Sequence, residues 1–256
     1  MSERMIDMTK DEISCPICHN NIFIEEIYNK RYDAYFRKCT CGICYRIKYD
    51  LNKIYTQYDF DSVTRIEHWH DVSIKSALRY YNKLISIVPY FNDLGYSVFE
   101  FGTSLGYFLN LMKEKGWKVG GIEISKRAVD YAKEKFGINI YNEDIENFKI
   151  DNTYDLVATF EVIEHLVDVD KFIKKVYNML NENGIFVFCT PNLNAPSTLF
   201  NNESEAYHCG HMILFNYNTI KKLLNDNNLN VIGVSQESNH FESWESMMII
   251  CSKRKI

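Results

Sequence analysis

Hydrophobic and polar residues follow a repeating order over the second half of the chain, from about residue 95 onward. Short apolar runs alternate there with stretches in which apolar residues recur every three or four positions. The apolar runs are residues 96–101, 117–124, 138–144, 154–160 and 185–191, and the helical stretches are residues 106–116, 125–137 and 168–184. Strands and helices that alternate at this spacing predict an α/β fold with a parallel sheet and right-handed crossovers.

The segments on either side of this region break the order. Apolar residues recur with helical spacing over residues 61–91, and Pro89 ends that run. After a further helix over residues 218–229, residues 230–238 and 245–253 form two strand-like runs with no helix between them. Such a pair favours antiparallel pairing at one edge of the sheet.

The first 49 residues have a different character, with short β-type runs between clustered cysteines. Cys15 and Cys18 form a CxxC pair, and Cys39, Cys41 and Cys44 follow on the far side of these runs. Two close pairs of thiolates supply the four tetrahedral ligands that zinc favours. We expect a structural zinc site in a small zinc-ribbon-like module, formed by Cys15, Cys18, Cys39 and Cys41, with Cys44 as the reserve ligand.

Other interpretations of this region stay open. The thiols could be buried without a metal, or the CxxC pair could be redox-active, although the helix that a redox pair normally opens is absent. Basic side chains interleaved with tyrosines could form a face for a sugar, a phosphate-bearing substrate or RNA, or could offset the charge of the thiolates. These side chains are Lys30, Arg31, Arg37, Lys38, Arg46 and Lys48.

Composition narrows the class of protein further. The chain has 256 residues, a formal net charge of −5, 46% hydrophobic residues and 25% charged residues. This globular composition excludes wholesale disorder, and the acidic balance argues against a general nucleic-acid binder. No run approaches the roughly 18 to 20 apolar residues of a membrane span, and residues 1–14 lack an apolar signal core. We therefore expect a cytoplasmic protein that does not insert into a membrane.

A glycine-containing loop follows the first strand of the α/β region. Gly102 and Gly106 permit a tight turn that lets backbone amides approach a ligand at a helix N-terminus. Glu123 ends the second strand, where a carboxylate can accept hydrogen bonds from both hydroxyls of a ribose. Glu100, just before the glycines, would repel a pyrophosphate but attract an amino group. The pattern favours an adenosine ligand with an amino group over a dinucleotide.

The fourth strand leads into the segment Phe-Glu-Val-Ile-Glu-His-Leu at residues 160–166. With the glycine loop, this segment resembles the class I S-adenosylmethionine-dependent methyltransferases, in the group with a strand-four motif of the E-V-I-E-H-L type. The resemblance covers residues 96–252, and Ser104 stands where the family's loop has its middle glycine. It implies a Rossmann-like methyltransferase fold, with a mostly parallel seven-stranded sheet and a C-terminal antiparallel strand pair, and S-adenosyl-L-methionine as cofactor.

Some relatives that carry an N-terminal zinc ribbon methylate sugars or surface glycans.

The resemblance also implies contacts for individual residues. The implied cofactor contacts are Glu100, Gly102 and Gly106 at the methionine moiety, Glu123 at the ribose, Asp144 and Ile145 at the adenine, and Glu161 at the methionine pocket.

Two forms of catalysis are open at the strand-four motif. If the motif is helical, Glu161, Glu164 and His165 share one face and could bind Mg²⁺. Ubiquinone-pathway O-methyltransferases and small-RNA 2′-O-methyltransferases among the relatives use such a group for metal-assisted methylation, and the RNA enzymes add a later histidine. Here His211 fits that position best, ahead of His208. Without a metal, His165 or His211 would be the general base, with Glu164 beside them.

These observations predict three parts: a zinc-ribbon-like module over residues 1–52, a helical linker or lid over 53–94, and a methyltransferase domain over 95–256. The linker contains His68, Trp69 and His70, which we expect to pack or to cover the cofactor. The predicted function is O-methylation of a small metabolite or of a sugar or glycan hydroxyl. An RNA methyltransferase that docks RNA on the ribbon, and a non-catalytic binding module, are the alternatives. The sequence predicts neither the acceptor nor the oligomeric state.

Overall fold

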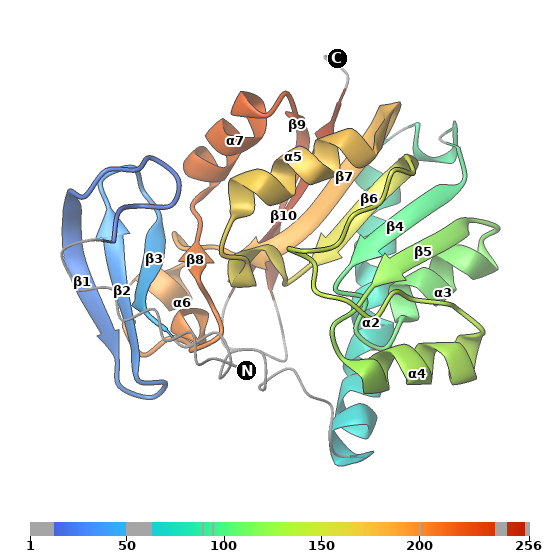
Figure 1. The fold of residues 1–256 in the computed structure, drawn as a ribbon, viewed down its shortest axis with the longest axis horizontal. Coiled ribbons are helices and arrows are strands. Elements are labelled where there is room, and N and C mark those ends of the chain that lie inside the picture. The colour runs from blue at the N-terminus through green and yellow to red at the C-terminus, as the bar shows by residue number, and fades with distance from the viewer. Residues whose placement is uncertain are drawn as a thin grey trace.

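Two β-sheets organise the molecule in the computed structural model, which describes residues 13–49, 63–88, 90–93, 95–199, 201–238 and 245–253. A six-stranded sheet has the order β5-β4-β6-β7-β10-β9, and a four-stranded sheet has the order β1-β2-β3-β8. Figure 1 shows the small blue sheet beside the larger one, with helices on both faces of the larger sheet. The smaller sheet therefore forms a module at one side of an α/β layer structure.

The larger sheet confirms the predicted fold class. Four of its strands are parallel and its last two are antiparallel. The parallel strands are β4 (Ser97–Phe101), β5 (Lys118–Ile122), β6 (Tyr154–Phe160) and β7 (Leu180–Pro191), and the antiparallel strands are β9 (Asn230–Ser238) and β10 (Glu245–Ser252). The predicted antiparallel pair at one edge is thus present.

The predicted strand over residues 138–144 differs from expectation, so the described part of the sheet has six strands where seven were expected. This segment makes one parallel bridge, from Tyr141 to Ile122. The Asn142 side chain donates to the carbonyls of Glu123 and Ile124, at 3.0 and 2.8 Å. Because these side-chain bonds occupy carbonyls that a longer ladder would need, the pairing stops after one residue.

Helices cover both faces of this sheet, as the alternation of residues along β7 requires. Phe186 and Phe188 pack into the core on one face, whereas Ile185 and Val187 pack into the core on the other. The first face carries α5 (Val169–Met179) and α7 (Tyr217–Asp226), and the second carries α2 (Val63–Ile87), α3 (Tyr107–Glu114) and α4 (Lys126–Phe136).

Helix ends agree with the sequence signals where a cap is present. The Ser125 hydroxyl accepts a hydrogen bond from the Ala128 amide, and Gly137 ends α4 in the left-handed conformation. Helix α5 ends at Met179, before the predicted end at residue 184, because β7 already begins at Leu180. The remaining helical segments are short: η1 (Phe91–Asp93), η2 (Ile163–His165), α6 (Pro196–Leu199) and η3 (Glu205–Tyr207).

The smaller sheet contains the cysteine-rich segment. Its first three strands are β1 (Phe23–Asn29), β2 (Ala34–Cys39) and β3 (Cys44–Lys48). The fourth is β8 (Ile213–Leu214), which comes from the far end of the chain and pairs antiparallel with β3. We call residues 13–49 the cysteine ribbon. The predicted boundary at residue 52, and the beginning of the predicted linker, lie outside the described residues.

Candidate cofactor and catalytic site

The loop after β4 has a backbone that requires its glycines. Gly102 and Gly106 have positive φ angles of 69° and 79°, and Ser104 between them has a φ of 48°. A Cβ on Gly102 would lie 2.5 Å from a methyl carbon of Val162, in the segment after β6. The loop therefore lies directly against the strand-four motif, and a side chain at position 102 would separate them.

Glu123 closes the same loop from the end of β5. Its carboxylate accepts hydrogen bonds from the backbone amides of Ser104, at 2.8 Å, and Ser125, at 2.9 Å. Burial raises the pKa of this carboxyl group, and the amide donors oppose that shift. The side chain is thus fixed at the carboxyl end of the sheet, beside the glycine loop.

Glu100 lies under this loop with one oxygen unsatisfied. The residue is 4% exposed, and its Oε2 has no hydrogen-bond partner among the residues that the structure describes. Burial, together with the nearby Glu123, raises the pKa of Glu100 well above its usual range. A buried carboxyl group without a donor fits a cationic ligand group, which would supply both a hydrogen bond and a compensating charge.

Asp144 and Ile145 lie on a turn beyond the Tyr141 bridge and are half-buried. The Asp144 carboxylate accepts from the Glu146 amide at 2.9 Å and from the Asn147 side chain at 2.8 Å. Glu146 in turn accepts from the Val167 amide at 2.6 Å, just after the strand-four motif. These bonds connect the turn to the segment that follows β6.

The predicted helical face of Glu161, Glu164 and His165 is wrong. Only Ile163–His165 form a short 3₁₀ turn, and Glu161 stands before it with a positive φ of 54°. The Glu161 amide donates to the Cys189 carbonyl at 2.9 Å, which extends the pairing of β6 with β7 past the end of β6. Because this pairing keeps Glu161 out of the turn, its carboxylate is not part of the Glu164–His165 group.

Glu164, His165 and His211 do come together. A nitrogen of each ring and a Glu164 oxygen lie within 4.8 Å of one another, and His165 Nε2 is 3.9 Å from Glu164 Oε1. Nδ1 of His165 lies 2.9 Å from the Gly210 carbonyl, and Nδ1 of His211 lies 2.7 Å from the Ala206 carbonyl. Since a carbonyl only accepts, these contacts favour the neutral tautomer with its proton on Nδ1 and its lone pair on Nε2.

The charges in this cluster follow from its burial. Burial lowers the pKa of His165 to about 4, and it lowers the pKa of His211 well below the usual range, with a further contribution from His165. Both rings are therefore neutral at pH 7. Glu164 is fully buried and accepts a hydrogen bond from the Thr190 hydroxyl at 2.9 Å.

Sequence reasoning missed three groups in this cluster: Thr190 and the carbonyls of Ala206 and Gly210. Position 190 near the end of β7 was a usable signal for Thr190, because the carboxyl ends of parallel strands meet at one edge. No pattern signals the carbonyls. His208 lies outside the cluster, with its ring against Tyr32 at a centroid distance of 4.7 Å.

The four predicted cysteines of the cysteine ribbon also come together. The sulfur atoms of Cys15, Cys18, Cys39 and Cys41 lie within 4.8 Å of one another. The contact between the two thiols lowers the pKa of Cys15 and raises the pKa of Cys41. Cys44 lies elsewhere, fully buried in the apolar core of the smaller sheet, and burial raises its pKa to about 12.

The basic residues of the cysteine ribbon are largely engaged in other contacts. Arg37 lies 3.0 Å from Glu26, Lys38 lies 3.2 Å from Glu25, and Arg31 lies 2.8 Å from Glu205. Arg37 and Arg46 are also buried. These pairings reduce the positive charge that the described ribbon offers to a phosphate backbone, which argues against the RNA alternative.

Within the linker, the side chains of His68 and Trp69 lie outside the described part of the structure. His70 on α2 contacts the hydroxyls of Tyr107 and Tyr131, which lie 2.7 Å apart. Tyr107 directly follows Gly106, so α2 packs beside the glycine loop. For His70, this agrees with the expected packing.

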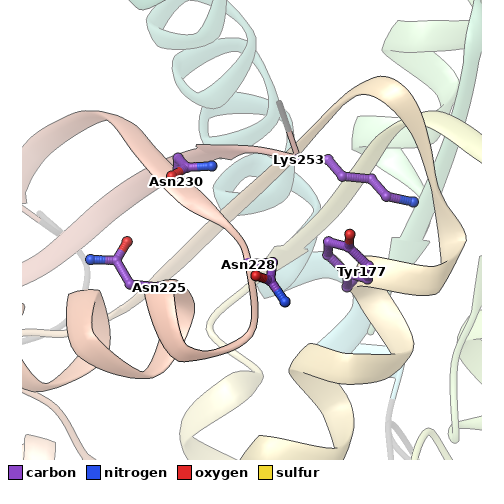
Figure 2. Close-up of a pocket in the computed structure, with 5 residues that line it drawn as sticks. All are labelled: Tyr177, Asn225, Asn228, Asn230 and Lys253. Carbon is purple, nitrogen blue, oxygen red and sulfur yellow. The ribbon is translucent and has the colours of Figure 1, made fainter. Parts of the chain in front are cut away.

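A cavity of about 480 Å³ lies away from all of these residues (Figure 2). It lies at the amino ends of the parallel strands, next to the beginning of β9 and the end of β10, whereas the glycine loop lies at their carboxyl ends. Its lining is polar, and its lysine already donates to the Leu180 carbonyl. The lining residues are Tyr177, Asn225, Asn228, Asn230 and Lys253.

None of the described helices has the length and apolar character that crossing a membrane requires.

The arrangement is that of an α/β methyltransferase: a glycine loop, an acidic residue ending the second strand, and the group of Glu164, His165 and His211 at the carboxyl ends of the parallel strands. Residues 68–234 match the family described as "Methyltransferase domain". The chain therefore belongs to the methyltransferase-domain family.

Individual relatives agree with this assignment. The chain is 31% identical over 135 residues to an uncharacterized methyltransferase of Bacillus cytotoxicus, covering 51% of this chain and 61% of that one. It is 30% identical over 112 residues to a ubiquinone biosynthesis O-methyltransferase of Rickettsia canadensis, covering 41% and 48%. The chain thus spans about half to three fifths of the length of these curated relatives.

A solved structure has the same fold. The N-methyltransferase NodS of Bradyrhizobium japonicum, in complex with S-adenosyl-L-homocysteine, matches with a TM-score of 0.54 and 17% identity, over 77% of this chain and 90% of that chain.

Proposed function

We propose that the protein transfers a methyl group from S-adenosyl-L-methionine to a hydroxyl group of a small metabolite or of a sugar or glycan. The observation that carries the cofactor assignment is the buried Glu100 oxygen under the glycine loop, which calls for a cationic partner. The observation that carries the acceptor class is the cluster of Glu164, His165 and His211, because a hydroxyl nucleophile needs its proton removed or its pKa lowered.

In this proposal, the cofactor supplies the electrophilic methyl group, and the chain binds and aligns the reactants. Glu100 holds the amino group of the methionine moiety, and the backbone around Gly102 and Gly106 approaches it closely. Glu123 accepts hydrogen bonds from the ribose hydroxyls. Alignment of the hydroxyl oxygen, methyl carbon and sulfur on one line accounts for most of the expected rate enhancement.

The adenine and methionine contacts complete the cofactor site of this proposal. Asp144 and Ile145 contact the adenine from their turn beyond β5. Glu161 lines the methionine pocket from the end of β6, close to the Val162 side chain that meets the glycine loop.

The Glu164–His165–His211 cluster activates the acceptor in this proposal. Its donor set, two neutral imidazoles and one carboxylate, suits Mn²⁺, Fe²⁺, Co²⁺ or Zn²⁺ better than Mg²⁺, which prefers an all-oxygen shell. A cation held there would lower the pKa of the acceptor hydroxyl. Without a cation, Nε2 of His165 or His211 accepts the proton directly.

Chelation separates these two roles. We expect a chelator to abolish methyl transfer while the cysteine ribbon retains its zinc, and we expect Mn²⁺ to restore transfer more effectively than Mg²⁺. Zinc content should be measured in the same samples. Full transfer in chelator by protein with no metal beyond the ribbon zinc would assign the cluster the role of a general base.

The four clustered cysteines hold a structural zinc ion in this proposal. Four thiolates complete a tetrahedral shell and leave no open position for a substrate, so the site stabilises the cysteine ribbon. A cytoplasmic location follows as part of the proposal, because clustered thiols persist in reducing compartments.

Titration calorimetry with S-adenosyl-L-methionine tests the cofactor assignment. Loss of a charged hydrogen bond costs about 1.5 to 3 kcal/mol, so Glu123→Ala should weaken binding by about 10- to 100-fold. Glu134→Ala, on the exposed surface of α4, is the matched control and should bind as wild type does. Absence of binding to the wild-type protein would overturn the proposed function. A screen of cell extract with methyl-labelled cofactor then identifies the acceptor.

A further inference from the structure

The segment from residue 201 to residue 216, between β7 and α7, orients both histidines of the cluster. It carries His211 itself, and it supplies the carbonyls of Ala206 and Gly210 that engage the two Nδ1 atoms. The tautomer and ring orientation of both histidines therefore depend on where this loop lies.

One end of the loop is held by Asn29 of the cysteine ribbon. Asn29 is fully buried, and its Nδ2 donates to the Ser204 carbonyl at 3.0 Å. Its Oδ1 accepts from the backbone amides of Arg31 and Tyr32, at 3.0 and 3.3 Å, and so fixes the turn after β1. The Ser204 hydroxyl accepts from the Ala206 amide at 3.3 Å. Asn29 thus holds Ser204, which lies two residues before Ala206, whose carbonyl orients His211.

The other end of the loop is held by β3. The Arg46 amide donates to the Met212 carbonyl at 2.8 Å, and the Met212 amide donates to the Glu164 carbonyl at 2.7 Å. Met212 therefore lies directly between the cysteine ribbon and the strand-four motif. The pairing continues as β3 with β8, where Tyr45 faces Ile213 and Cys44 faces Leu214.

The cysteine cluster itself contacts the segment that follows β8. The Cys41 carbonyl accepts from the Thr219 hydroxyl at 2.8 Å, and the Gly42 carbonyl accepts from the Asn216 side chain at 2.6 Å. Gly42 has a φ of 99°, and a Cβ there would lie 2.5 Å from Asn216 Nδ2. The turn of the second cysteine pair therefore fits closely against the first turn of α7.

We propose that the cysteine ribbon is a positioning module for His165 and His211, and that Asn29 is its principal positioning residue. The ribbon fixes the loop over residues 201–216, and the carbonyls of the loop fix the Nδ1-protonated tautomer of both rings. The role of the two histidines in methyl transfer rests on the proposed function. Their orientation by the ribbon does not, and it can be measured without an acceptor.

Asn29→Asp isolates the contact with the loop. An aspartate keeps the oxygen that accepts from Arg31 and Tyr32 but removes the donor to Ser204. Asn20→Asp is the matched control, because the Asn20 oxygen accepts from the Ile22 amide in an exposed turn of the same ribbon. If Asn29→Asp fails to fold, Asn29→Ser keeps a short acceptor for the turn but is too short to reach Ser204.

Ring ¹⁵N NMR at pH 7 reports the tautomer of each histidine. In the wild-type protein and in Asn20→Asp, we expect single Nδ1-protonated forms of His165 and His211. In the Asn29 variants we expect exchange between tautomers. Mn²⁺ binding, followed by electron paramagnetic resonance of the free ion, should weaken about 10- to 100-fold, as for other losses of groups that orient metal ligands. Cofactor affinity should not change.

Unchanged histidine tautomers in a folded, zinc-loaded Asn29 variant would overturn the positioning role. Failure of the wild-type protein to bind S-adenosyl-L-methionine would instead overturn the proposed function, and it would leave the tautomer measurement valid. If the wild-type protein binds no Mn²⁺, the histidine tautomers of the Asn29 variants alone decide whether Asn29 positions the two rings.

Discussion

The cysteine cluster and the Glu164–His165–His211 cluster are two groups of potential metal ligands that are built in opposite ways. The four cysteines come from two turns within the first 41 residues, and their sulfur atoms could surround an ion completely. The second cluster combines two adjacent residues after β6 with one residue from a loop beyond β7. A cluster assembled from local turns stabilises its own module, whereas one assembled from distant elements depends on whatever holds those elements in place.

The two clusters also differ in whether a metal ion bound there would have a coordination position left for a substrate. Four thiolates fill a tetrahedral shell, so a metal bound there has no place for a substrate oxygen. Two imidazoles and a carboxylate leave positions for further ligands, which is the arrangement of sites that act on a substrate. In the proposed function, the contrast is therefore between a closed structural site and an open site for the acceptor, and the contacts of Asn29 and Met212 connect the two.

Loss of one thiolate should have the largest effect, because structural zinc binding contributes about 10 to 16 kcal/mol of apparent free energy in small zinc modules. We expect Cys18→Ser to lose zinc and to unfold the cysteine ribbon. Cys18 is exposed, so the substitution removes a ligand without opening a core cavity. Zinc content by elemental analysis and the near-ultraviolet circular dichroism of the ribbon tyrosines would measure this.

Cys44→Ala is the control within the same module. It removes a buried thiol that lies outside the cluster, so zinc content should stay at the wild-type value. Loss of zinc from Cys44→Ala together with retention in Cys18→Ser would show that the ligand set is wrong.

Substitution in the open cluster should affect turnover and leave the fold intact. A side chain that removes a proton in the transition state contributes about 10²- to 10⁴-fold to the rate, so His211→Ala should reduce methyl transfer by that factor. Binding of S-adenosyl-L-methionine should stay unchanged, since His211 lies outside the glycine loop. Transfer to the acceptor found in the extract screen measures the first quantity, and calorimetry measures the second.

Glu203→Ala, at an exposed position of the same loop, controls for disturbance of the loop. Equal transfer rates for His211→Ala and Glu203→Ala would show that His211 takes no part in methyl transfer, and the contrast between the two sites would then fail.

The contrast also explains how much could be predicted from the sequence. The cysteine cluster, the order of strands and helices around Gly102, and the cap at Ser125 depend on short spacings, and each has the predicted geometry. The helix that would place Glu161 on one face with Glu164 and His165 is absent, because the pairing with β7 continues past Phe160. The carbonyls that orient the histidines, and Asn29 beneath them, depend on contacts across most of the chain, which no local pattern contains.

Two buried carboxyl groups extend the comparison to the cofactor side. Glu164 accepts a hydrogen bond from Thr190, whereas Glu100 Oε2 has no partner among the described residues. Burial raises the pKa of Glu100, so the folded protein binds this proton more tightly than the unfolded chain does. The stability contributed by protonated Glu100 should therefore be present at low pH and be lost as the pH rises from the unfolded-state value through the raised folded value.

The pH dependence of cofactor affinity should have the opposite sign to that of stability. It is the smallest effect expected, since the affinity for S-adenosyl-L-methionine should change by at most tenfold per pH unit. A bound amino group favours the ionised carboxylate, so affinity for S-adenosyl-L-methionine should rise with pH up to the raised pKa, with release of one proton. Calorimetry in buffers of different ionisation enthalpy, between about pH 5 and pH 7.5, counts that proton. Glu100→Gln should bind more weakly and release none. Identical proton release by the wild type and Glu100→Gln would mean that another group titrates, and Glu100 would then not be the residue that meets the amino group.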